Sequence, residues 1–283
     1  MIRTFISGRR IIADVPPSPP PLPRETAAPA PSAPSGRGRI RAEIAIVLGL
    51  SLGTSAVAAI VQLIDLSTRS APLGHQSAAL NTSDSTRPVF DLLYQLIDLG
   101  AQLVPVALVC FLLWRATAPH LGALGIDARR PVRDAALGIL LALVIGIGGI
   151  GVYLGGRALG VTVAVSANGL GSYWWTVPVL LLSALRAGLQ EEVIVVGYLF
   201  ARLRRLGVGP WPIIVATSLF RGTYHLYQGW GAFVGNAIMG LIFGTLYQRY
   251  GRLLPLIIAH TLIDAAIFVG YSWAAATFPA LLR

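Results

Sequence analysis

The sequence contains no lysine and a single cysteine, and charged residues make up only 12% of its 283 positions. Because Cys110 has no second cysteine to pair with, an internal disulfide and a cysteine-based metal cage are both excluded. The scarcity of charge, together with a mean hydropathy of +0.69, excludes an ordinary soluble domain. These absences indicate a protein that crosses a lipid bilayer several times.

Arginine supplies all 22 basic residues, and the formal net charge is +10. Such an excess can indicate nucleic-acid binding, but most of these arginines lie in short segments between apolar runs, where cytoplasmic loops collect them. With residue 1 placed inside, the inside segments hold 16 arginines and the outside segments hold four. We therefore predict no nucleic-acid partner, an integral protein of the plasma membrane, a cytoplasmic N-terminus and a C-terminus outside.

The apolar runs predict an all-α polytopic membrane protein, because about 20 apolar residues in a helix cross a bilayer. We expect about seven transmembrane helices, at 44–64, 92–114, 135–154, 183–203, 211–227, 231–247 and 253–274. Glycines in the third run, Gly146, Gly148, Gly149 and Gly151, predict close contact with another helix.

Composition divides the chain into three predicted parts. Residues 1–40 are rich in proline and alanine, which predicts a disordered cytoplasmic tail. Residues 41–172 hold the first three membrane helices. Residues 173–283 hold a four-helix catalytic core in the C-terminal half.

Two acidic residues lie in the middle of the fourth predicted span. Glu191 and Glu192 occur in the otherwise apolar stretch SALRAGLQEEVIVVGYLFARL, residues 183–203. At the centre of a bilayer a single ionised side chain costs roughly 2.5 to 3.5 kcal/mol. The two carboxylates therefore need polar partners or a chemical task.

Two later spans offer such partners at helical spacing. Arg221 and His225 are four residues apart, and so are His260 and Asp264. Residues at this spacing share one face of a helix. Because lipid excludes polar groups, we predict that these faces point into the bundle and that the histidines meet the glutamates in a polar pocket.

Each of these groups also has a purely structural interpretation. Glu192 taken alone can be a hydrogen bond between helices, and His225 alone can be an interfacial histidine. Asp264 can serve only to orient His260. The joint occurrence of acids and imidazoles in neighbouring spans favours catalysis, since the chain has only four histidines.

Other polar and aromatic residues of the spans are predicted to be structural. Asp98 and Gln102 in the second span are expected to join helices. Tyr224, Tyr227 and Trp230 are expected to form an aromatic belt at the membrane surface.

At these positions the chain resembles the CAAX protease and bacteriocin-processing enzymes, the Abi family of intramembrane endopeptidases. The family pattern is Glu-Glu-x-x-x-Arg, then Phe-x-x-x-His, then His-x-x-x-Asn or Asp. Glu191 and Glu192 match the first motif, His225 matches the histidine of the second, and His260 with Asp264 matches the third. The resemblance covers roughly residues 173–270.

The chain departs from the family pattern at two positions. Val196 stands where the family has arginine, and Arg221 stands where it has phenylalanine. We expect Arg221 to replace the missing arginine and pair with Glu192, because a buried carboxylate without a partner is strongly destabilising. Arg186 is the competing partner.

The resemblance implies an intramembrane endopeptidase that hydrolyses a peptide bond of a peptide or protein substrate, as in CAAX processing. Glu191 and His225 would activate the water, and His260 with Asp264 would stabilise the oxyanion. Alternatively, the enzyme is a metalloprotease in which Glu191, His225 and His260 hold one divalent metal, a ligand set that suits zinc.

Two functions of other classes remain open at this point. In a proton-coupled transporter, Glu191, Glu192 and His225 would relay protons, although no internal repeat supports a transporter. In a catalytically silent relative, which Val196 makes credible, the fold would act as an immunity or partner-binding protein.

Overall fold

A computed structural model describes residues 36–278, and these residues belong to one compact unit that begins at Gly36. The unit is almost entirely helical, as the composition predicts. The predicted tail, residues 1–40, lies outside the described residues except for its last five, which begin the first helix.

The helices lie over the apolar runs of the sequence, although their ends differ from those of the predicted spans. In chain order they are α1 (Gly36–Gly49), α2 (Leu52–Thr68), α3 (Pro88–Leu112), α4 (Pro131–Ala158), α5 (Thr176–Glu191), α6 (Leu199–Arg205), α7 (Pro210–Thr223), α8 (Trp230–Tyr250) and α9 (Leu254–Thr277). Proline occupies the first turn of α3, α4, α7 and α9, where the missing amide hydrogen costs nothing.

Shorter elements complete the described part of the chain. A π-helix, η3 (Glu192–Tyr198), joins α5 to α6 without a break. The 3-10 turns are η1 (Leu73–His75), η2 (Gly122–Leu124) and η4 (Leu226–Gln228), and the strands are β1 (Ser77–Ala79) and β2 (Ala164–Ser166). The two strands pair in parallel, with Ala78 opposite Val165.

Four of the described helices, α3, α4, α8 and α9, are long and apolar enough to cross a membrane. The first predicted span is divided into α1 and α2, which are bent by 58° and count as a fifth span if taken together. The fifth predicted span is shorter than expected, because the 14 residues of α7 extend about 21 Å against a hydrocarbon core of about 30 Å. The structure thus supports four to five spans in an integral membrane protein, and seven stays a prediction.

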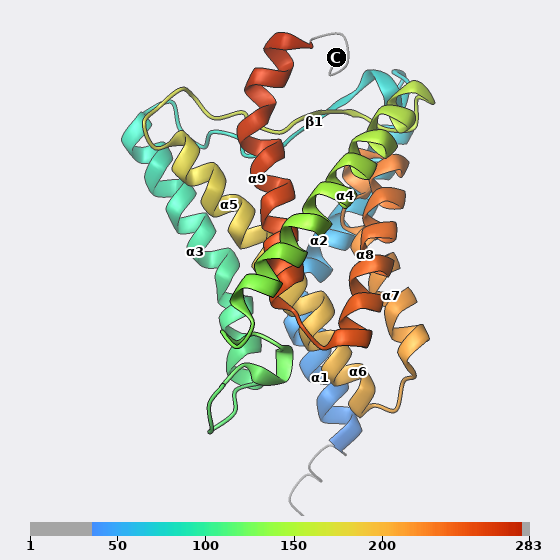
Figure 1. The fold of residues 1–283 in the computed structure, drawn as a ribbon. Helices are drawn as coiled ribbons and strands as arrows, with labels where there is room; N and C mark the ends of the chain where they lie inside the picture. The colour runs from blue at the N-terminus through green and yellow to red at the C-terminus, as the bar shows by residue number, and fades with distance from the viewer. Residues whose placement is uncertain (1–35, 279–283) are drawn as a thin grey trace, which may run out of the picture. The chain divides into compact units, whose positions relative to one another are not determined.

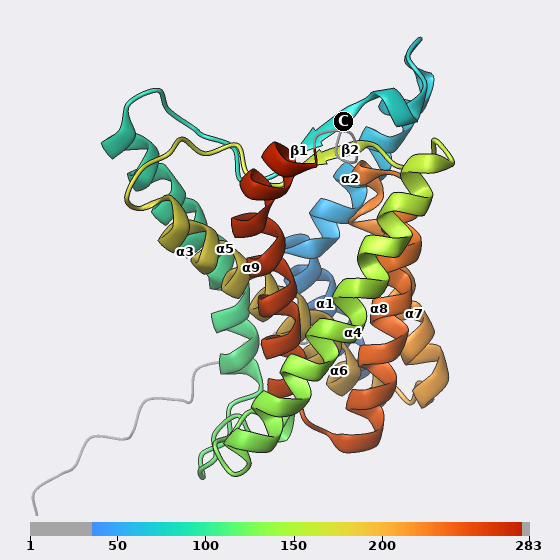
Figure 2. The same cartoon turned by 45° about the horizontal axis from the view of Figure 1, so that its top comes forward.

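The closest helix contacts occur where glycine allows two backbones to approach. A Cβ at Gly240 in α8 would lie 2.8 Å from the Cα of Ser218 in α7, and one at Gly188 in α5 would lie 2.5 Å from Thr261 Oγ1 in α9. The pairs α7–α8 and α5–α9 are the most extensively packed in the bundle. Figures 1 and 2 show each pair side by side.

The predicted role of the glycines in α4 is wrong. Nothing lies within 4 Å of a Cβ built at Gly148, Gly149 or Gly151, and at Gly146 only Ile263 comes as near as 3.8 Å. Gly148, Gly149 and Gly151 are exposed on the helix surface, and Gly146 makes only an ordinary van der Waals contact with α9. The close approach of α4 occurs instead at Gly138, against Ile258 of α9.

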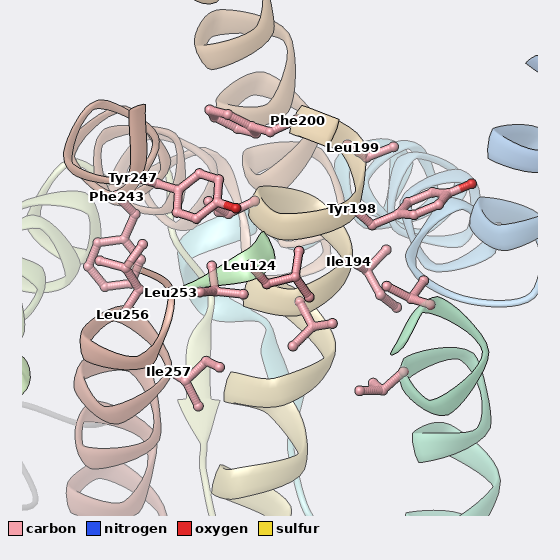
Figure 3. Packing of buried hydrophobic residues seen from close by; sticks show 14 of the residues in the cluster. Leu124, Ile194, Tyr198, Leu199, Phe200, Phe243, Tyr247, Leu253, Leu256 and Ile257 are labelled. Atoms are coloured by element: carbon pink, nitrogen blue, oxygen red, sulfur yellow. The ribbon is translucent and has the colours of Figure 1, made fainter. Parts of the chain in front are cut away.

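The largest group of buried apolar side chains surrounds the π-helix. Ile194 and Tyr198 of η3 are buried together with Phe200 of α6, Phe243 of α8 and Leu256 of α9, as Figure 3 shows. Because lipid is as apolar as these residues, close packing rather than exclusion from water stabilises this region. The core fixes the turn that follows Glu192.

The segments between helices gather at two opposite ends of the bundle. One end holds the start of α1, the α3–α4 connection, the α6–α7 connection and the α8–α9 turn, and the other end holds β1, β2 and η4 (Figures 1 and 2). This grouping is the one that the arginine distribution requires. Which end faces the cytoplasm stays a prediction.

Candidate active site

The predicted polar residues converge where α5 becomes the π-helix. Glu191 ends α5 and Glu192 begins η3, and both are buried. Arg221 comes from α7 and His260 from α9, and Arg221 and Glu192 are each 0% exposed. Three segments distant in the sequence therefore contribute to one buried cluster.

The π-helix sets the geometry of the acidic pair. All seven residues of η3 are buried, and the wider π turn replaces the ordinary helical turn directly after Glu191. Turns of this kind are rare and occur frequently at functional sites. Val196, which stands at the family's arginine position, lies inside this turn and is 2% exposed.

Two polar side chains form hydrogen bonds with the same oxygen of Glu192. Arg221 Nη2 donates a hydrogen bond to Glu192 Oε1 over 2.6 Å, and His260 Nδ1 lies 2.7 Å from the same oxygen. Because a carboxylate only accepts, the proton of this second bond is on Nδ1. The expected ion pair between Arg221 and Glu192 is thus present.

The same guanidinium also approaches the other glutamate. Arg221 Nη1 lies 3.9 Å from Glu191 Oε2. Arg186, the competing partner, instead donates to Gln190 Oε1 over 3.2 Å. A single buried cation therefore balances two adjacent carboxylates, which would otherwise repel each other strongly.

Glu191 is held on one side and free on the other. Tyr224 Oη donates to Glu191 Oε2 over 2.7 Å, whereas His225 Nε2 lies 3.7 Å from Glu191 Oε1. The longer distance exceeds that of a direct hydrogen bond. Both ring nitrogens of His225 are buried without a hydrogen-bond partner among the described residues.

The structure places Tyr224 in this cluster, not in the predicted aromatic belt. Its side chain is buried and bonded to Glu191, whereas Trp230 is 51% exposed. The signal that could have found Tyr224 is its position directly before His225 and three residues after Arg221. A tyrosine at the end of a span is usually interfacial, which explains the error.

His225 does not share a helix face with Arg221, contrary to the spacing argument. α7 ends at Thr223, and His225 lies just beyond it, at the start of η4. The turn is tied to the strand region outside the helices, because the Val163 amide donates to the Gln228 carbonyl and the Trp230 amide donates to the Val161 carbonyl. The backbone of His225 itself joins the end of α7 to η4, because its amide donates to the Gly222 carbonyl over 3.0 Å and its carbonyl accepts from the Gln228 amide.

Asp264 and His260 do occupy one turn of α9. His260 Nε2 lies 3.6 Å from Asp264 Oδ2, on the side of the ring away from Glu192. The imidazole is therefore flanked by a carboxylate at each nitrogen. This arrangement fixes the ring plane in the pocket.

Asp98 and Gln102 do not join helices as predicted. Gln102 donates to Asp98 one turn away on α3 itself, and Asp98 is exposed on the helix surface. The pair therefore lies outside the cluster.

The donor set does not fit the zinc site considered from the sequence. Within residues 36–278, no three His, Cys, Asp or Glu side chains are arranged to hold a metal ion. The Arg221 guanidinium already lies beside Glu191, and His260 directs both nitrogens at carboxylates. A cation in the cluster opposes a second one by charge repulsion, so the structure does not support the ligand set Glu191, His225 and His260.

Fold and site together define an integral membrane protein with a carboxylate and imidazole cluster enclosed by its helices. Comparison with protein families gives a match over residues 173–266 to the description Type II CAAX prenyl endopeptidase Rce1-like. These residues form a domain of that family, which confirms the resemblance and implies an intramembrane protease. The match includes Glu191, Glu192, His225, His260 and Asp264.

No curated protein and no solved structure matches the chain.

Proposed function

We propose that the protein is an intramembrane endopeptidase in which Glu191 and His225 activate the attacking water without a metal ion. The observation that carries the proposal is the gap of 3.7 Å between Glu191 Oε1 and His225 Nε2. A water located to one side of the line between them can lie about 2.8 Å from both atoms. Within residues 36–278 no group donates a hydrogen bond to Glu191 Oε1, because Tyr224 donates to Oε2.

The proposed reaction conserves every atom and proton. The water oxygen attacks the carbonyl carbon of the scissile bond, and its proton passes to Glu191. The C–N bond then breaks, and the same proton passes from Glu191 to the leaving amine nitrogen. General base and general acid roles of one carboxylate in sequence typically contribute roughly 100- to 10,000-fold each in rate.

His260 is proposed to stabilise the oxyanion. Its Nδ1 is committed to Glu192, so Nε2 is the nitrogen that can donate to the substrate oxygen. Asp264, 3.6 Å from Nε2, offsets the charge of a protonated ring. Loss of one donor of this kind typically costs roughly 100- to 1,000-fold in kcat.

The location of Arg221 argues against a silent relative. The main reason to suspect lost activity is Val196 in place of the family arginine. The ion pair of 2.6 Å between Arg221 and Glu192 supplies a cation to this carboxylate from the neighbouring helix. Arg221 therefore supplies the positive charge beside Glu192 that the family motif supplies from the position of Val196.

The test is cleavage of a quenched peptide library by the purified protein. We expect Glu191→Gln and His260→Gln to reduce the turnover roughly 100-fold or more, because they remove the base and the oxyanion donor. Asp98→Asn is the matched control, since it neutralises a carboxylate outside the cluster. A metal chelator is expected to leave the rate unchanged.

Cleavage by Glu191→Gln at the rate of the unmodified protein would contradict the proposed base. Loss of cleavage with chelator, restored by added zinc, would contradict the metal-independent mechanism.

A further inference from the structure

Arg186 is a second arginine within the helical bundle, and unlike Arg221 it has no carboxylate within ion-pair distance in the described part of the chain. It lies on α5 five residues before Glu191, about 7.5 Å along the helix axis toward the end that holds β1 and β2 (Figure 1). Among residues 36–278, no carboxylate forms an ion pair with its guanidinium.

The donors of Arg186 are only partly used. Nη1 donates to the neutral side-chain amide of Gln190 over 3.2 Å, and Nε is buried without a hydrogen-bond partner. A guanidinium has five N–H donors in a planar fork that matches a carboxylate. A charged group at this depth in a membrane protein is costly unless an anion binds it.

Arg186 belongs to the accessible side of the cluster. It interacts electrostatically with Asp264 and Tyr227, and the Tyr227 ring stacks against His225 at 6.5 Å between centroids. The side chains of His225 and Asp264 are each 19% exposed. The side chains of Glu192 and Arg221, on the opposite side of the cluster, are completely enclosed.

We propose that Arg186 binds a carboxylate group of the substrate and so positions the neighbouring peptide bond against Glu191 and His225. The inference rests on the proposed protease function and adds a specificity-determining residue to it. The carboxylate has two sources in a peptide, the free C-terminus and an aspartate or glutamate side chain. Either carboxylate could accept the hydrogen bonds of Arg186 that Gln190 does not accept.

The experiment compares peptides that differ in a single charge. A cleaved peptide is prepared with a C-terminal carboxylate or a C-terminal amide, and separately with its acidic side chains replaced by amides. We expect one of these neutral forms to have a KM roughly 10- to 100-fold higher, the effect of losing charge-assisted hydrogen bonds. The form that responds identifies the source of the carboxylate.

The variant Arg186→Gln is expected to raise KM for the acidic peptide to that of its neutral form and to leave kcat nearly unchanged. Arg186→Lys should restore part of the discrimination, because it keeps the charge but loses the fork. Arg249→Gln is the matched control, since Arg249 is an exposed arginine at the end of α8.

Discrimination between acidic and neutral peptides that persists in Arg186→Gln would overturn the inference. An equal loss of kcat for both peptides would also overturn it, because that result indicates a structural role.

Binding separates this inference from the proposed function. Affinity of the same fluorescent peptides for Glu191→Gln is measured with and without Arg186→Gln. A preference for the acidic peptide that depends on Arg186 supports the carboxylate site even if no peptide is cleaved, and equal affinities for both peptides count against it.

Discussion

At the scale of single residues, the hydroxyl of Tyr224 determines the orientation of the Glu191 carboxylate. It donates to Oε2 over 2.7 Å, so Oε1 is left for the gap toward His225. Without that bond the carboxylate would be free to rotate, and a buried oxygen would lose its partner. A rotated carboxylate would no longer direct Oε1 at the proposed bridging water.

We therefore expect Tyr224→Phe to reduce kcat roughly 10-fold, the equivalent of about 1.4 kcal/mol in the barrier, with little change in KM. The ring still fills its space between Leu52 and Val195, so thermal stability in detergent should stay close to that of the unmodified protein. Steady-state kinetics on the cleaved peptide provide the measurement.

Tyr227→Phe is the control for this substitution, because in the described part of the chain the Tyr227 hydroxyl bonds only to Gln228, as the acceptor of its side-chain amide. A kcat for Tyr224→Phe within twofold of the unmodified protein would exclude a positioning role.

The sequence predicts the motif residues of this cluster better than their neighbours. The sequence locates Glu191, Glu192 and His260, because an ionisable side chain at membrane depth almost always faces the interior of the bundle. It does not locate Tyr224, since a tyrosine is tolerated both at the interface and inside. Only the direction of the Tyr224 hydroxyl distinguishes an interfacial tyrosine from one inside the bundle, and a single sequence does not show that direction.

At the scale of the elements, the approach of α7 to α8 brings Arg221 to the glutamates. Gly240 makes that approach possible, because a Cβ there would meet the Ser218 backbone at 2.8 Å and its hydroxyl at 3.0 Å. Ser218 lies one turn before Arg221 on α7. A displacement of α7 therefore moves the guanidinium directly.

We expect Gly240→Ala to destabilise the protein by about 1 to 3 kcal/mol, the usual cost of overpacking, and to lower cleavage activity further by shifting Arg221. Gly270→Ala in α9 is the matched control, since nothing lies within 4 Å of a Cβ there. Thermal unfolding and peptide cleavage of both variants are compared. Equal thermal stability and equal cleavage rates of the two variants would show that the close approach of α7 and α8 is not needed for either property.

Element boundaries were the least predictable part of the fold from sequence. The break at Leu50 and Ser51 divides an uncharged apolar run that reads as one span, and α7 ends at Thr223, four residues before the end of its predicted run at Tyr227. The π-helix is equally hidden, because one wider turn does not disturb the apolar periodicity of residues 192–198. These features depend on packing against other helices.

At the scale of the whole described unit, two distant connections are joined by Arg252. It lies between α8 and α9, donates to Asp127 Oδ1 over 2.8 Å and also bonds to Asp134 at the start of α4. The hydrogen bond from Arg252 holds the pKa of Asp127 below its ordinary value of 3.8. The bonded carboxylate therefore stabilises the folded state.

This shift predicts a pH dependence of stability. Because the folded pKa is lowered, the contribution of Asp127 is fully present above its ordinary pKa and is lost as the pH falls through the folded value. The difference in thermal stability between the unmodified protein and Asp127→Asn should be constant above about pH 5 and should narrow below it. A difference that is unchanged down to pH 3 would contradict the role of this pair.

The pairing of η4 with residues 161–163 has a practical consequence. His225 lies directly before η4, and the end of η4 is tied by the Gln228 carbonyl to the segment of residues 161–163, outside the helices that carry the glutamates. A water-soluble antibody or a crosslink that displaces residues 161–163 would shift η4 and, through it, His225, and is expected to lower the proposed activity while the glutamates stay in place. Control of the proposed activity would then not require a reagent that enters the lipid.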